Sequence, residues 1–110
     1  TVVTVNLSTG NFFEVDLEAL TGNVATLTIQ NTDTTSSQVS SFIMKITQGT
    51  TTTTRNFAWA SIVSNGTNID WSGGTGPDIT TGADKVDILS FTSYDNGTTW
   101  YGAIVGQDFS

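Results

Sequence analysis

Carboxylates are the side chains with which this sequence could do acid–base chemistry, because it contains no histidine and no cysteine. Their absence excludes Ser-His-Asp triads, Cys-His pairs and the usual zinc sites. A glycosidase needs two acids about 5–9 Å apart across a cleft. Glu14 and Glu18 are the only glutamates, and on one strand they would lie ~13 Å apart. We therefore predict that the protein is not an enzyme, with an Asp pair from different strands as the remaining catalytic alternative.

The sequence contains no complete motif for binding phosphate or a metal ion. Gly73-Gly74-Thr75-Gly76 is followed by Pro77, so it lacks the lysine and the helix of a phosphate loop. Aspartates at turns usually bind their own backbone, and their spacing here matches no calcium loop. We expect no metal and no cofactor, with Ca²⁺ at turn aspartates as the alternative. The candidate oxygen ligands are Asp70, Asp78, Asp84, Asp87 and Asp95.

Aromatic side chains are the better candidates for binding a partner. Trp100 and Tyr101 are adjacent on an expected strand, so they face opposite sides and one of them leaves the core face. An outward aromatic could stack on a sugar ring or anchor a subunit interface, and we favour the interface. The candidate interface residues are Trp59, Trp71, Trp100 and Tyr101, together with the run from Thr50 to Thr54 as a contact loop.

The elements that must position these side chains are strands. Helix formers are scarce, while threonine, serine, glycine and asparagine, which favour strands and turns, are abundant. Apolar residues alternate with polar ones in three places, although 13–20 could also form one short helical turn. These alternating sets are Phe13, Val15 and Leu17; Ala25, Leu27 and Ile29; and Phe42, Met44 and Ile46.

The chain is expected to close on a C-terminal hairpin with strands at 86–94 and 100–105. Asp95-Asn96-Gly97 between them suits the positive φ angles of a tight turn. About seven or eight short strands, with turns roughly every 8–12 residues, predict an all-β fold. We expect residues 1–110 to form a single β-sandwich domain of jelly-roll or Ig-like type with antiparallel strands.

The formal net charge of the chain indicates which classes of partner it can bind. The formal net charge is −7, and Lys45, Arg55 and Lys85 are the only cations. Such a surface is repelled by phosphate backbones and by anionic lipids, so we expect no nucleic-acid and no membrane partner. No apolar run approaches the ~20 residues that a membrane-spanning helix needs.

The order of elements in the C-terminal part resembles a segment near the C-terminus of many tailed-bacteriophage virion proteins. These include tail-fibre proteins, minor-tail proteins and small capsid proteins. The resemblance covers about the last two-thirds of the chain, and Ser72 stands where such segments often have proline. Its motifs are Asp70-Trp71, residues 73–77, Lys85 to Phe91, Asp95 to Gly102, and Gln107-Asp108-Phe109.

The resemblance implies a small β-sandwich, commonly a trimer, on the outer surface of a phage particle. It supplies no catalytic residues. A single short domain fits a capsid decoration (cement) protein that contacts itself and the major capsid protein or other virion proteins. The alternatives are a tail-fibre tip that binds host-surface glycans and, from a different class, a carbohydrate-binding module.

Overall fold

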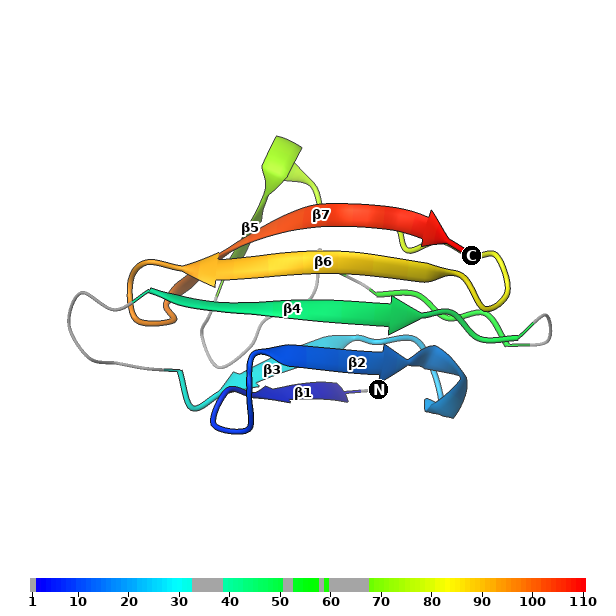
Figure 1. The fold of residues 1–110 in the computed structure, drawn as a ribbon, viewed down its shortest axis with the longest axis horizontal. Helices are drawn as coiled ribbons and strands as arrows, with labels where there is room; N and C mark the ends of the chain where they lie inside the picture. The colour runs from blue at the N-terminus through cyan, green and yellow to red at the C-terminus, as the bar shows by residue number, and fades with distance from the viewer. Residues whose placement is uncertain (1, 33–38, 51–52, 58, 60–67) are drawn as a thin grey trace.

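The computed structural model of the chain describes residues 2–32, 39–50, 53–57, 59 and 68–110 (Figure 1). Strands dominate this part of the chain, and its helical structure consists of two short 3₁₀ turns. The all-β prediction is confirmed. The elements are β1 (Val2–Asn6), β2 (Phe12–Asp16), η1 (Leu17–Ala19), β3 (Thr26–Gln30), β4 (Ser40–Thr47), β5 (Asn68–Trp71), η2 (Ser72–Gly74), β6 (Val86–Ser93) and β7 (Thr99–Phe109).

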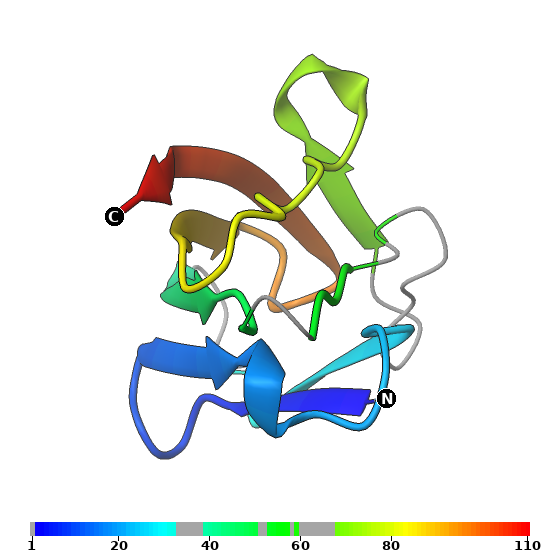
Figure 2. The same ribbon diagram turned by 90° about the vertical axis from the view of Figure 1, so that its right-hand side faces the viewer.

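The strands form two sheets. β1 and β3 make a two-stranded sheet, and the other five strands follow the order β2-β4-β6-β7-β5 (Figure 1). β5 and the η2 turn project from one side of the molecule, away from β1 and β3 (Figure 2). No helix in the described residues has the length and apolar character needed to cross a bilayer.

The prediction of antiparallel strands is wrong for part of the fold. β4–β6 and β6–β7 are antiparallel, whereas β1–β3, β2–β4 and β5–β7 are parallel. Each parallel pair joins strands that are separated by another strand in the sequence; β3, for example, lies in the other sheet between β2 and β4. Alternation of side chains is the same for either strand direction, so the sequence pattern could not reveal the parallel pairs.

The alternating patterns place most inward residues correctly. Leu27 and Ile29 on β3 are buried, as are Phe42, Met44 and Ile46 on β4. Ala25 is an exception, because it precedes β3 and is exposed, while its neighbour Val24 is buried and bridges Phe57.

The stretch from 13 to 20 combines the two structures expected for it. β2 ends at Asp16, and η1 begins at the buried Leu17. The Asp16 side chain accepts a hydrogen bond from the Glu18 backbone N–H at 3.0 Å, which caps the turn. Glu18 therefore does not share a strand with Glu14, and the distance expected from strand geometry does not apply to this pair.

The C-terminal hairpin is confirmed. β6 and β7 pair antiparallel, and Asn96 and Gly97 adopt φ angles of 60° and 87° in the turn between them. Both angles are positive, as the tight hairpin turn requires. β7 runs on to Phe109, with two register shifts against β6 after Ile104.

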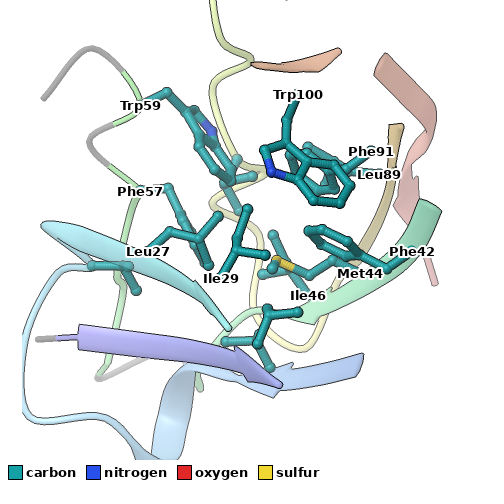
Figure 3. Packing of buried hydrophobic residues seen from close by; sticks show 14 of the residues in the cluster. Leu27, Ile29, Phe42, Met44, Ile46, Phe57, Trp59, Leu89, Phe91 and Trp100 are labelled. Atoms are coloured by element: carbon teal, nitrogen blue, oxygen red, sulfur yellow. The ribbon is translucent and has the colours of Figure 1, made fainter. Parts of the chain in front are cut away.

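Aromatic rings and aliphatic side chains together fill the core that the two sheets share (Figure 3). The Phe91 ring stacks on Phe42 with centroids 4.7 Å apart, and its centroid lies 5.5 Å from Trp71 and 6.2 Å from Trp59. The Phe42 ring also meets Trp100 at 5.2 Å. Contacts of this kind add about 0.5–1.5 kcal/mol each to the hydrophobic gain of burying the rings.

Two glycines make room for the tryptophans. A Cβ on Gly102 would lie 2.7 Å from the Trp71 ring, and one on Gly76 would lie 2.4 Å from the Trp59 Cβ. Real Cβ atoms do not approach this closely, so any larger residue would push the indole away. The Gly-rich segment before Pro77 and the Trp-Tyr-Gly sequence of β7 therefore serve packing.

We predict that Phe91→Ala lowers the free energy of unfolding by about 3–5 kcal/mol, because it leaves a cavity among the rings of Phe42, Trp59 and Trp71. Phe12→Ala is the matched control, since the Phe12 side chain is 54% exposed. That control should cost less than about 1 kcal/mol. Urea unfolding followed by tryptophan fluorescence measures both variants. Equal losses would contradict an aromatic core centred on Phe91.

Candidate interaction surface

The structure separates the candidate aromatics into buried and exposed side chains. Trp100 is 0% exposed and Trp59 is also buried, so neither side chain is on the surface in the described fold. Trp71 is half-buried and packs against the core. Tyr101 is 52% exposed. The prediction that Trp100 and Tyr101 face opposite sides is therefore confirmed, and Tyr101 is the one that leaves the core face.

Tyr101 lies on the outer face of the five-stranded sheet with a second tyrosine beside it. Tyr94 is 67% exposed, and the two ring centroids are 6.0 Å apart with their planes tilted by 56°. In register with Tyr101 are Thr92 on β6 and Asp70 on β5, whose side chain is exposed. We call Tyr94, Tyr101 and Asp70 the tyrosine wedge.

Sequence reasoning missed Tyr94. It ends the expected strand at 86–94, and in an extended chain it would share the outward parity of Thr92. That parity was the available signal. Parity alone does not say which face of β6 points to the core. The structure answers this, because Leu89 and Phe91 are fully buried and Tyr94 therefore points outward.

Further apolar side chains lie along β7. Ile104, Val105 and Phe109 are all large and exposed. β5 pairs with β7 from Thr99 to Gly102, and no described strand pairs with β7 on that side beyond Gly102. A shallow hollow of about 190 Å³ opens where β5 ends; its lining residues are Trp71, Ser72, Thr75, Pro77, Gly102, Ala103 and Ile104.

The described part of the expected contact loop, residues 50–54, lies away from the tyrosine wedge. The Thr50 backbone N–H and hydroxyl donate to Glu18 Oε2 at 3.0 and 3.3 Å, and Thr54 is exposed. Residues 51–52 lie outside the described part of the chain. Thr50 follows the end of β4, whereas Tyr101 lies near the start of β7, at the opposite end of the sheet (Figure 1). These two candidate contact regions are therefore separate.

The Asp87 carboxylate is almost completely buried and acts as a structural clamp. It accepts hydrogen bonds from the Thr80 backbone N–H and hydroxyl at 2.7 Å each. It also accepts from Gln107 Nε2 at 3.2 Å and from the Asp108 N–H at 3.0 Å. These bonds tie the loop before β6 to the end of β7.

Gln48 is a second buried clamp. Its Nε2 donates to the carbonyl oxygens of Arg55 and Thr80 at 2.8 and 2.9 Å. Its Oε1 accepts from the N–H groups of Gly49 and Arg55 at 2.9 and 3.0 Å. The amide thus satisfies both its donors and its acceptor, and it holds together three segments that form no sheet with one another.

Asp95 serves the hairpin turn. Its Oδ1 accepts from the Thr99 backbone N–H at 2.8 Å and from the Ser93 hydroxyl at 3.0 Å. The bond from the Thr99 backbone is the main reason that the pKa of the Asp95 carboxyl falls below its usual value of 3.8. The candidate Ca²⁺ ligands are thus dispersed, and the described residues contain no group of three or more His, Cys, Asp or Glu placed to hold a metal ion.

Comparisons of the chain with protein-family models, with curated proteins and with solved structures found no match.

We predict that Asp87→Ala lowers the free energy of unfolding by about 1–3 kcal/mol, because it removes the acceptor of the Thr80 N–H and hydroxyl and of the Asp108 N–H. Asp78→Ala removes an exposed carboxylate from the same loop and should change it by less than about 0.5 kcal/mol. Chemical unfolding of both variants provides the test. If Asp87→Ala were as mild as its control, the clamp would not hold the loop to β7.

Proposed function

We propose that this chain is a non-enzymatic structural protein of a bacteriophage virion, most simply a capsid decoration or cement protein that binds the outer shell as a trimer. The observation that supports it best is the location of the exposed apolar side chains. Of the nine large ones on the described residues, five lie between residues 94 and 109: Tyr94, Tyr101, Ile104, Val105 and Phe109. This is the segment that resembles phage virion proteins.

The fold supports the same proposal. We regard the two sheets and their common core as a β-sandwich related to the jelly-roll or Ig-like type, with parallel pairs at both edges of the larger sheet. The carboxylates of Asp87 and Asp95 accept hydrogen bonds that hold a loop and a turn in place. Both carboxylates therefore have a structural role in the fold.

The mechanism would be mechanical. Ile104, Val105 and Phe109 on β7 would become buried against neighbouring copies, and the tyrosine wedge would contact the major capsid protein or other virion proteins. Each interface buried in the assembled shell but absent from the separated subunits favours the assembled state by mass action. Closed symmetry limits such an assembly to a defined number of copies.

The two alternative functions, a tail-fibre tip and a carbohydrate-binding module, would use the tyrosine wedge to bind a sugar. A tail-fibre tip would present the tyrosine wedge to a host-surface glycan, and a carbohydrate-binding module would do so as a monomer. The wedge favours these alternatives only in part, because planes tilted by 56° do not form a continuous platform for stacking a sugar ring.

We predict a native mass close to three times 11.6 kDa for the purified chain, measured by light scattering behind a sizing column. Since each copy carries a formal net charge of −7, repulsion opposes association. Raising the salt from about 20 to about 300 mM should screen that repulsion and increase the trimer fraction. A mass that stays near 11.6 kDa at every protein and salt concentration would contradict a trimer formed in solution.

A further inference from the structure

We propose that the tyrosine wedge binds a lysine or arginine side chain from a basic segment of a protein partner. The inference names the partner chemistry of the surface in the proposed function, and it rests on that function only for the virion origin of the partner. Its basis is the geometry of two rings and a carboxylate, together with the charge of the whole chain.

The wedge has the shape and polarity that a cation prefers. The faces of tyrosine rings carry negative electrostatic potential, and they attract a cation within about 6 Å of the ring centroid. Tyr94 and Tyr101 have centroids 6.0 Å apart and planes tilted by 56°, so a single charged group can approach both rings. Asp70, in register with Tyr101 and exposed, adds a formal negative charge on the same face.

The cation has to come from outside the chain. All three cations are engaged elsewhere: Lys45 Nζ lies 3.9 Å from Glu14 Oε1, and Lys85 Nζ lies 3.9 Å from Asp108 Oδ1. The Arg55 guanidinium donates two hydrogen bonds to the Leu20 carbonyl oxygen, at 3.1 and 2.9 Å. With a formal net charge of −7, the molecule attracts basic partners over a longer range and repels its own copies at this face.

A protein partner fits these features better than a sugar does. A neutral sugar gains from stacking on a flat, open ring face and from hydrogen bonds, but it gains nothing from the net charge. A flexible basic side chain uses the tilted rings, the Asp70 carboxylate and the charge of the molecule together. The contact would position a neighbouring virion protein beside β5 and β7.

The test is a titration of the ¹⁵N-labelled chain with an acetylated and amidated hexa-arginine peptide, followed by NMR amide shifts at low salt. We expect the largest shifts at Tyr94, Tyr101 and Asp70. The double variant Tyr94→Ser/Tyr101→Ser should bind about five-fold more weakly or worse, the order expected for losing two exposed cation–π contacts. The double variant Tyr94→Phe/Tyr101→Phe keeps both ring faces and should bind like the wild type.

Matched controls separate the wedge from general charge attraction. Asp70→Asn should weaken binding about two-fold or more, whereas Asp78→Asn, which removes the same charge elsewhere, should leave it nearly unchanged. Phe12→Ser removes an exposed ring from the far edge of the sheet and should have no effect.

Several results would overturn the inference. One is an unchanged affinity in the serine double variant, and another is an equal loss for Asp70→Asn and Asp78→Asn. A third is a chitohexaose titration that shifts the wedge residues while the peptide does not. A fourth is a change of the same signals on simple dilution, which would show that another copy covers the wedge. Because the titration uses the purified chain alone, it can fail or succeed independently of any virion role.

Discussion

Contact between aromatic rings is the interaction on which the rest of this small domain depends. Phe91 lies in the middle of the network, stacked on Phe42 and packed near Trp59 and Trp71. Figure 3 shows the rings of Phe42, Trp59 and Phe91 together, and Trp71 on β5 also contacts Phe91, so one cluster joins parts of the chain that are distant in sequence. Because the network takes up Trp59 and Trp100, these two tryptophans are not part of the exposed surface, whereas Tyr94 and Tyr101 are.

Buried polar side chains hold the segments that the aromatic rings do not contact. Hydrogen bonds to Gln48 and Asp87 fix the positions of the segments at Arg55, Thr80 and Asp108. A buried carboxylate is stable only when it is well supplied with donors, and Asp87 has four. Among the described residues, the buried carboxylate of Asp87 is therefore used by the fold.

Periodicity predicted inward residues of β3 and β4, and Asp95-Asn96-Gly97 predicted the hairpin, because both are local properties of the chain. Parallel pairing could not be read in the same way, since it depends on which distant strand lies alongside. For the surface, adjacency on a strand showed that Trp100 and Tyr101 must face opposite sides. The burial of Trp100, the position of Tyr94 and the clamp at Asp87 required the three-dimensional packing.

The proposal that the domain reinforces a phage shell is tested most directly by the heat stability of the particles. Particles assembled without this chain would be heated in parallel with complete ones, and DNA release would be followed with a fluorescent dye. The account predicts release at a lower temperature without the chain, and recovery of the original temperature when the purified protein is added back. The same release temperature with and without the protein would contradict the cement role.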